Sequence, residues 1–189
     1  WIIGCAAVGF MANFAVQQLL TALYSAIYPD FLNFNDRSVI NALLNAPVLM
    51  TIGVTVLVPV TEETLFRGLI FRGLHDRSPM LAYVVSMAAF AAIHVLGYIG
   101  SEDITTLLIC FLQYLPAGLC LSWTYTKADN IFAPIVVHAL VNAIAIGEDL
   151  AFVTAPNELF DTNSVYTEEH SPFKMTFTCG YANGHWFYI

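Results

Sequence analysis

The chain has 189 residues, of which 58% are hydrophobic and only 11% are charged, and its formal net charge is −8. An ordinary soluble domain carries about 25% charged residues, so the composition argues against a soluble protein and indicates a multi-pass membrane protein. Only six Lys and Arg residues are present in the whole chain, which argues against a nucleic-acid partner, because such a partner needs clustered basic residues.

The apolar runs predict an all-α transmembrane helical bundle with about five spans, since each span needs roughly 20 apolar residues. In chain order these runs are residues 1–28, 39–60, 80–99, 104–125 and 131–146. A polar linker at 29–37 separates the first two, with Asn35 or Asp36 as the expected helix cap. Pro47 and Pro59 lie inside the second run, so we expect kinks there. Because the chain begins at Trp1, we expect a fragment or a processed product.

The sequence divides into a helical transmembrane domain at 1–149 and a polar, aromatic tail at 150–189. The tail lacks helical periodicity, so we expect it to be poorly structured, with a short strand possible at 175–178. Arg72, Arg77 and Lys127 lie in turns that two spans separate, and the positive-inside rule makes that side cytoplasmic. The four cysteines show no paired spacing, so neither disulfides nor a thiolate zinc site is expected.

Two adjacent carboxylates follow the second apolar run, in the sequence Thr61-Glu62-Glu63-Thr64-Leu65-Phe66-Arg67-Gly68. Ionisable groups at membrane depth are costly and usually functional. On a helix Glu63 and Arg67 are four residues apart and share a face, which predicts an ion pair and leaves Glu62 available for chemistry. The alternative is a capped helix end, in which Thr61 is the N-cap and both carboxylates complement the helix dipole.

Two later spans each carry polar groups on a single stripe of the helix. Phe90 and His94 are four residues apart, as are His138 and Asn142. A single buried histidine is more often a satisfied structural residue. Polar groups from three helices, surrounded by apolar side chains, instead indicate one convergent site.

This set of residues suits the activation of water for amide hydrolysis. A desolvated carboxylate at Glu62 is a better base near neutral pH, and His94 can help to hold and deprotonate the water. His138 and Asn142 can donate hydrogen bonds to the oxyanion of a tetrahedral intermediate. No serine or cysteine belongs to the set, which disfavours a covalent mechanism. A metal centre on Glu62, His94 and His138 remains an alternative, although we expect no cofactor.

The ordered motifs Glu62-Glu63-x-x-x-Arg67, Phe90-x-x-x-His94 and His138-x-x-x-Asn142 resemble the signatures of the CAAX prenyl endopeptidase and bacteriocin-processing (abortive-infection) family of intramembrane proteases. The resemblance covers the motif core at 48–146. It implies a glutamate-dependent endopeptidase in which Glu62 and His94 activate water, His138 and Asn142 support the oxyanion, and Glu63 with Arg67 shapes the site.

The resemblance also implies the partners and the location of the protein. Eukaryotic relatives cleave prenylated CAAX proteins, and many bacterial relatives are linked to bacteriocin maturation or self-immunity. We therefore expect a multi-pass protein of a bacterial cell membrane that acts on a prenylated or leader-type peptide. Two other classes stay open: a non-enzymatic immunity or peptide-binding protein, and a transporter with a Glu62–His94 proton relay.

Overall fold

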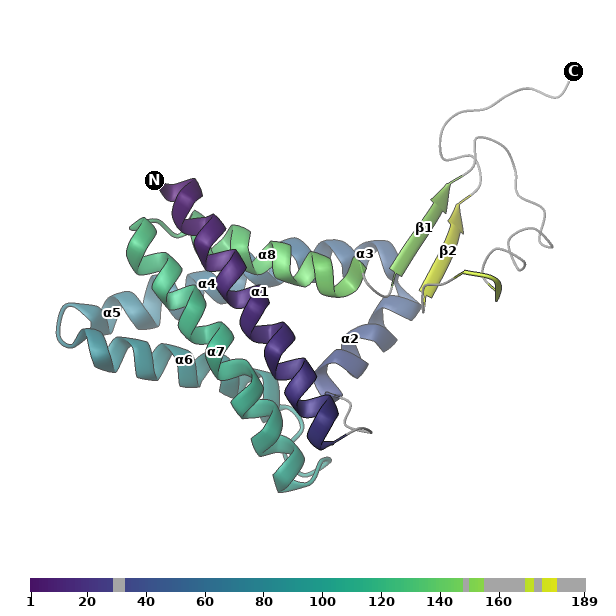
Figure 1. Ribbon diagram of the computed structural model, residues 1–189, viewed down its shortest axis with the longest axis horizontal. Helices are drawn as coiled ribbons and strands as arrows, with labels where there is room; N and C mark the ends of the chain where they lie inside the picture. Colours follow the sequence, from purple (N-terminus) through teal and green to yellow (C-terminus); the bar gives the residue numbers. More distant parts are fainter. Residues whose placement is uncertain (29–32, 148–149, 155–168, 172–174, 180–189) are drawn as a thin grey trace, which may run out of the picture. The chain divides into compact units, whose positions relative to one another are not determined.

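The computed structural model describes residues 1–28, 33–147, 150–154, 169–171 and 175–179, and Figure 1 shows their arrangement. The predicted all-α membrane domain is confirmed. Two of its segments, η1 and η2, are π-helical, so Pro47–His75 is one apolar stretch with two widened parts. The elements are α1 (Ile2–Ile27), α2 (Phe34–Asn45), α3 (Pro47–Ile52), η1 (Gly53–Leu57), α4 (Val58–Glu63), η2 (Thr64–Phe71), α5 (Arg72–His75), α6 (Pro79–Leu96), α7 (Ile104–Ala128), α8 (Phe132–Gly147), β1 (Leu150–Thr154) and β2 (Met175–Cys179).

The chain forms two compact units, Trp1–Asn142 and Ala143–Ile189. In the second unit, β1 and β2 pair in parallel, with Leu150 opposite Met175. The short strand that the sequence allowed at 175–178 is thus present as β2. The expectation of a poorly structured tail concerns mainly residues 155–168 and 180–189, which lie outside the described residues.

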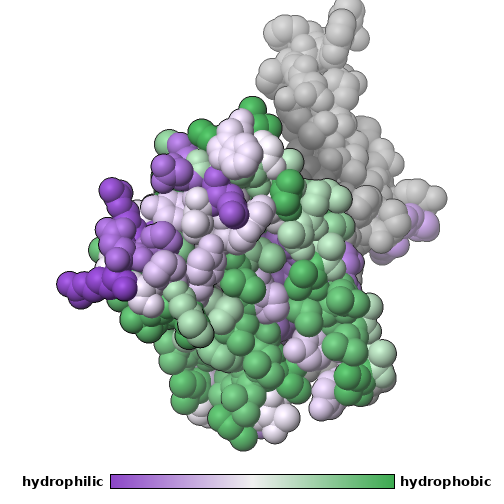
Figure 2. All heavy atoms as spheres, turned by 60° about the vertical axis from the view of Figure 1, so that its left-hand side comes forward, coloured by the Kyte–Doolittle hydropathy of each residue, from purple (hydrophilic) through white to green (hydrophobic). Residues whose placement is uncertain are grey.

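Four described helices are long and apolar enough to cross a membrane: Ile2–Tyr24, Pro47–His75, Pro79–Leu96 and Ile104–Ala128. The fifth predicted span is the shorter apolar helix α8, whose 16 residues extend about 24 Å at 1.5 Å per residue, against about 30 Å for a hydrocarbon core. Many large apolar side chains are exposed, as Figure 2 shows for one face of the molecule. By their length and composition, these helices indicate a multi-pass membrane protein.

Both prolines of the second apolar run disturb the helix, as predicted. The chain bends at Ala46, directly before Pro47, and the π-helical η1 ends two residues before Pro59. The proline ring crowds the preceding turn, and a widened turn relieves this crowding. The predicted cap at Asn35 or Asp36 is wrong, because α2 already begins at Phe34. The Asn33 side chain caps it by accepting a hydrogen bond from the Asn35 N–H.

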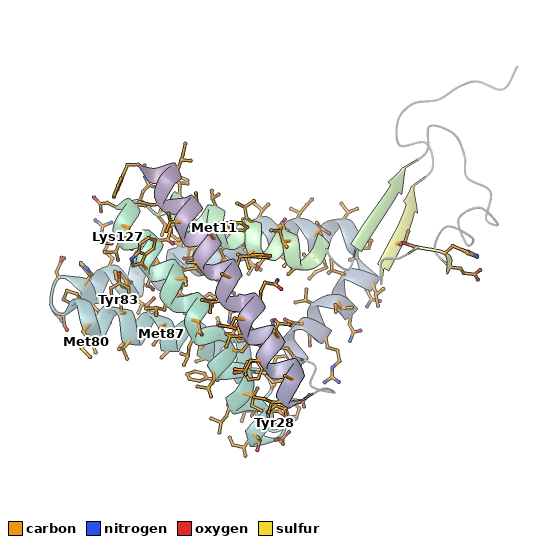
Figure 3. All side chains as sticks on the ribbon, in the orientation of Figure 1. Met11, Tyr28, Met80, Tyr83, Met87 and Lys127 are labelled. Carbon is orange, nitrogen blue, oxygen red and sulfur yellow. The ribbon has the colours of Figure 1, made fainter. Side chains whose placement is uncertain are left out.

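Within the first unit, α6 and α7 pack along each other in opposite directions. The hydroxyl of Tyr83, near the start of α6, donates to Thr126 near the end of α7, and Figure 3 shows Tyr83 and Lys127 at the same end of this pair. The helices approach closely at Gly118, where an added Cβ would lie 3.1 Å from the Met87 Cα. An apolar cluster between the helices supports the polar site, and consists of Phe66, Phe90, Ala117, Leu121 and Val137.

Candidate active site

The acidic pair lies within a continuous helix and not at its start. Glu62 and Glu63 are the last two residues of α4, and η2 continues directly from Thr64. The Thr61 hydroxyl donates to the Leu57 carbonyl one turn earlier, so Thr61 does not cap a helix. The capped-end alternative is therefore wrong, and the two carboxylates are placed at depth in the second span.

The predicted ion pair between Glu63 and Arg67 is confirmed. Arg67 Nη1 lies 2.9 Å from Glu63 Oε1, and both side chains are fully buried. Arg67 Nη2 also donates to the Gly118 carbonyl of α7 at 2.9 Å, and the guanidinium lies 4.7 Å from the centre of the Phe90 ring. The charge is therefore shared among α4, η2, α6 and α7, which fixes these helices relative to one another.

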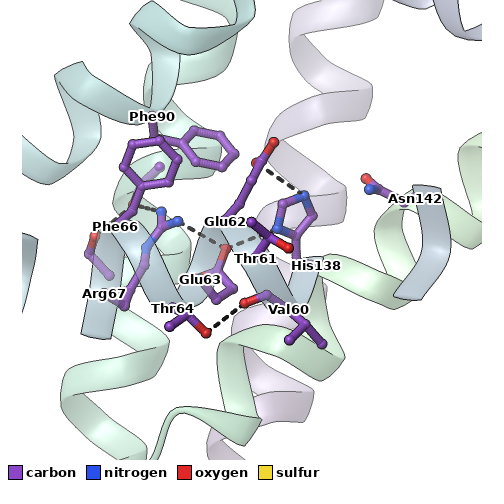
Figure 4. A network of polar contacts seen from close by, with 12 residues as sticks. Val60, Thr61, Glu62, Glu63, Thr64, Phe66, Arg67, Phe90, His138 and Asn142 are labelled. Carbon is purple, nitrogen blue, oxygen red and sulfur yellow. Dashed lines mark hydrogen bonds and ion pairs between the residues drawn. The ribbon is translucent and has the colours of Figure 1, made fainter. Parts of the chain in front are cut away.

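His138 of α8 joins this ion pair through the same carboxylate oxygen. Its Nδ1 lies 2.9 Å from Glu63 Oε1, and Figure 4 shows Arg67, Glu63 and His138 in a continuous chain of contacts. Because a carboxylate paired with arginine accepts hydrogen bonds, Nδ1 of His138 carries the proton. The other ring nitrogen, Nε2, consequently faces Glu62.

His94 of α6 is anchored differently. Its Nδ1 lies 2.8 Å from the Phe90 carbonyl on the same helix. A carbonyl only accepts, so Nδ1 is again the protonated nitrogen, and in the neutral ring Nε2 is an acceptor. The predicted sharing of one helix face by Phe90 and His94 is visible in their ring contact, with centroids 4.9 Å apart.

Glu62 lies between the two imidazoles. Its Oε2 is 4.0 Å from His94 Nε2 and 4.0 Å from His138 Nε2. This oxygen is buried and accepts no hydrogen bond from any residue that the structure describes. A distance of 4.0 Å is too long for a direct hydrogen bond but suits groups bridged by a small polar molecule. The arrangement is thus suited to holding a water molecule or the polar atoms of a substrate.

Asn142 occupies a separate position on α8. Its Nδ2 donates to the Val54 carbonyl at 2.9 Å, and Figure 4 shows it apart from Glu62 and Glu63. The Val54 carbonyl needs this donor, because the Val58 N–H bonds to the Gly53 carbonyl in the widened turn and the next residue, Pro59, has no N–H. Five of the six predicted residues therefore meet at one place. Asn142 contacts the same helical stretch at Val54, about two turns before Glu62.

Two contributors to the site were not predicted. The Gly118 carbonyl accepts from Arg67, and the ring of Tyr114 stacks on His94. The sequence did contain a signal for this part of the fourth span, because the polar residues Gln113 and Tyr114 lie close to Pro116 in a mainly apolar run. Among the described residues, no three His, Cys, Asp or Glu side chains are grouped closely enough to hold a metal ion.

Residues 44–144, which carry all six predicted site residues, match the family described as type II CAAX prenyl endopeptidase Rce1-like. The chain belongs to this family. The chain is also similar to the UPF0177 protein YxdF of Lactococcus lactis subsp. lactis, with 26% identity over 75% of this chain and 72% of that protein.

Two further relatives are also bacterial. The Bacillus subtilis protein named "Putative membrane peptidase YdiL" is 25% identical over 59% of this chain and 41% of its own length. The UPF0177 protein YbdI of Lactococcus lactis subsp. lactis is 23% identical over 77% of this chain and 74% of its own length. No solved structure is a significant match. Family membership and the peptidase relative support an intramembrane protease as the class of this protein.

Proposed function

We propose that this Rce1-like protein hydrolyses a peptide bond of a membrane-associated peptide, using Glu62 as the general base for an attacking water. The observation that carries the proposal is the position of Glu62 Oε2, 4.0 Å from the Nε2 atom of both histidines. This oxygen is buried and accepts no hydrogen bond from any described residue, so its lone pairs are available to accept a proton from water.

In the first step, Glu62 removes one proton from a water molecule. The second O–H group of the same water donates a hydrogen bond to Nε2 of the neutral His94 ring. The oxygen then attacks the carbonyl carbon of the scissile peptide bond, and the carbonyl electrons move to the oxygen. This forms a tetrahedral oxyanion. Positioning the water between two fixed acceptors removes much of the entropic barrier to this attack.

In the second step, the oxyanion electrons return to the carbonyl, the C–N bond breaks, and protonated Glu62 gives its proton to the leaving nitrogen. We assign His138 the support of the oxyanion, because its Nε2 lies on the Glu62 side of the ring and donates a hydrogen bond when the ring is protonated. We assign Asn142 a different task, which is to hold the widened turn through the Val54 carbonyl. Glu63 and Arg67 hold this side of the site in place.

The substrate class follows from the environment of the site. The helix that carries Glu62 is a candidate membrane span, so a scissile bond reaches it most readily when the peptide is itself anchored in the bilayer. We therefore propose a prenylated C-terminal peptide or an apolar leader-type peptide as the substrate. The prenylated class is the one that the family description names.

The test is cleavage of a panel of quenched fluorescent prenylated and leader-type peptides by the detergent-purified protein. The wild type is compared with Glu62→Gln, which keeps the shape of the side chain and removes the base. Glu102→Gln is the matched control, because Glu102 lies in the turn before α7 and pairs with the exposed Arg37. Each protein is assayed with and without a strong chelator.

We expect cleavage by the wild type and by Glu102→Gln, with and without chelator, and a loss of about 10²- to 10⁴-fold in kcat for Glu62→Gln. Loss of wild-type activity in chelator would replace the glutamate mechanism with a metal-dependent one. Unchanged activity in Glu62→Gln would remove Glu62 from the mechanism. If the wild type binds peptides of the panel but cleaves none, a non-enzymatic peptide-binding or immunity protein becomes the better description.

A further inference from the structure

Tyr114 of α7 lies against the histidine of the site that has no charged anchor. The rings of Tyr114 and His94 are stacked, with centroids 4.2 Å apart and planes inclined by 23°. The same side chain packs against the apolar cluster that contains Phe66 and Phe90. Tyr114 belongs to none of the three sequence motifs and has no part in the mechanism described above.

The hydroxyl end of Tyr114 is held by the first turn of α2. Asn35 Nδ2 donates to the Tyr114 hydroxyl oxygen at 3.2 Å. On the adjacent residue, Gln113 Oε1 accepts from Asn33 Nδ2 at 2.8 Å, and Asn33 is also the N-cap of α2. Two amide groups near the start of α2 therefore fix the position of this part of α7, and with it the plane of the Tyr114 ring.

His94 needs such support because, within the part of the chain that the structure describes, its side chain is hydrogen-bonded to a backbone carbonyl alone. The bond from Nδ1 to the Phe90 carbonyl fixes one atom of the ring and leaves rotation about that contact possible. The reacting atom is Nε2, on the far side of the ring, where a small rotation produces the largest displacement. An aromatic ring stacked on the imidazole resists this rotation, and stacked aromatic pairs contribute energy beyond their buried area.

We propose that Tyr114 is a positioning residue, which holds the imidazole of His94 so that Nε2 points to Glu62, and that Asn35 in turn orients Tyr114. This inference rests on the proposed peptidase function, because positioning matters only if His94 Nε2 takes part in the reaction. The Tyr114 ring positions His94 by stacking on it, and the Tyr114 hydroxyl helps to hold the Tyr114 ring in that place. Loss of the ring and loss of the hydroxyl should therefore have different consequences.

The kinetic test compares Tyr114→Leu, which removes the ring, with Tyr114→Phe, which keeps it. We expect Tyr114→Leu to lower kcat by about 10- to 100-fold, the size expected for misplacing a catalytic group, with KM changed less than threefold. Tyr114→Phe should retain most of kcat. Tyr83→Leu is the matched control, since Tyr83 is also a half-buried tyrosine facing a neighbouring helix, but contacts Phe71 and Thr126 instead of the site.

A second measurement does not depend on activity. In a sample with isotope-labelled histidines, the stacked Tyr114 ring should shift the carbon-bound ring protons of His94 upfield, and His94→Gln identifies these signals. The shift should persist in Tyr114→Phe and disappear in Tyr114→Leu, or in Tyr114→Met if the leucine variant does not fold.

The two measurements separate this inference from the proposed function. If the wild type cleaves no peptide, the proposed function fails, and the His94 signals still decide whether Tyr114 holds the ring. If the wild type is active but Tyr114→Leu has the kcat of the wild type, or if the His94 signals do not respond to loss of the ring, the positioning role is wrong. If Tyr83→Leu lost as much kcat as Tyr114→Leu, the loss in Tyr114→Leu would reflect general destabilisation and not positioning.

Discussion

The two sides of Glu62 present the same chemical group by different means. On one side, His138 is anchored by a carboxylate that is itself paired with a buried arginine. On the other, His94 is anchored by a backbone carbonyl and a stacked tyrosine. Both place Nε2 at 4.0 Å from Glu62 Oε2. The carboxylate and the carbonyl each accept from an Nδ1 atom, so in both histidines Nε2 is the ring nitrogen left to act at Glu62, although one anchor belongs to a buried ion pair and the other to a helix backbone.

The sharpest test of this comparison replaces each histidine in turn with asparagine. The amide Nδ2 of asparagine takes roughly the position of imidazole Nδ1, so the anchor is kept and Nε2 is lost. We expect His94→Asn and His138→Asn each to lower kcat by about 10²- to 10⁴-fold, with little change in the free energy of unfolding. Peptide cleavage and unfolding in a denaturing detergent are the measurements.

Replacement by alanine should then separate the two sides. His138→Ala leaves a buried Glu63 oxygen without one of its donors, which costs about 1–3 kcal/mol. His94→Ala removes a donor only from the Phe90 carbonyl, which belongs to a helix backbone. The free energy of unfolding should therefore change less in this variant than in His138→Ala. Equal destabilisation by the two alanine variants would show that the anchors do not differ in the way described here.

The next largest effect is expected from breaking the buried ion pair. Glu63→Gln leaves the Arg67 charge buried without its carboxylate, and removing one partner of such a pair costs about 3–5 kcal/mol. The double variant Glu63→Gln with Arg67→Met should recover part of this loss. Glu102→Gln removes the partner of Arg37, whose side chain is 54% exposed, and should cost at most about 1 kcal/mol.

A smaller effect is expected at Gly118, whose carbonyl belongs to the charged side of the site. A Cβ there would lie 3.2 Å from the Met87 carbonyl oxygen, so Gly118→Ala should force α6 and α7 apart by a few tenths of an ångström and destabilise the protein by about 1–3 kcal/mol. Gly73→Ala is the control, because a Cβ at Gly73 has no heavy atom within 4 Å. As a helical glycine in open space, Gly73 should accept alanine with a slight gain in stability.

The smallest effect concerns the turn that precedes α7. Asp103 caps this helix, because its carboxylate accepts hydrogen bonds from the backbone N–H groups of Thr105 and Thr106 and from the Thr106 hydroxyl. The bond from the Thr106 hydroxyl is the largest cause that lowers the pKa of Asp103 below its usual 3.8. Because the folded-state pKa is depressed, the cap stabilises the protein above pH 3.8 and this contribution disappears as the pH falls below that value. Thermal unfolding of wild type and Asp103→Asn should therefore differ at pH 6, and the difference should shrink as the pH falls below 3.8. A difference that persists in acid would contradict this.

The sequence was sufficient to predict the fold class, the Glu63–Arg67 pair and the meeting of both histidines at Glu62. These depend on helical periodicity and on the cost of burying charge, which the sequence displays directly. The sequence was not sufficient to predict that Tyr114 and the Gly118 carbonyl contact the site. Both reach it through the packing of α7 on α6, and the spacing of residues within one helix does not reveal that packing. The Asn142 contact depends on the widened turn at Gly53–Leu57, which could not be read from Pro59 alone.

The i to i+4 spacing of Glu63 and Arg67 also bears on how the protein enters the membrane. A lone Arg or acidic residue at the centre of a span costs about 2.5–3.5 kcal/mol on insertion scales. Since both charges of this pair lie on the same helix, they can neutralise each other as soon as that helix forms, before any other helix is present. The second span can therefore leave the translocation machinery with its Glu63–Arg67 ion pair already formed, and later helices need only pack against it.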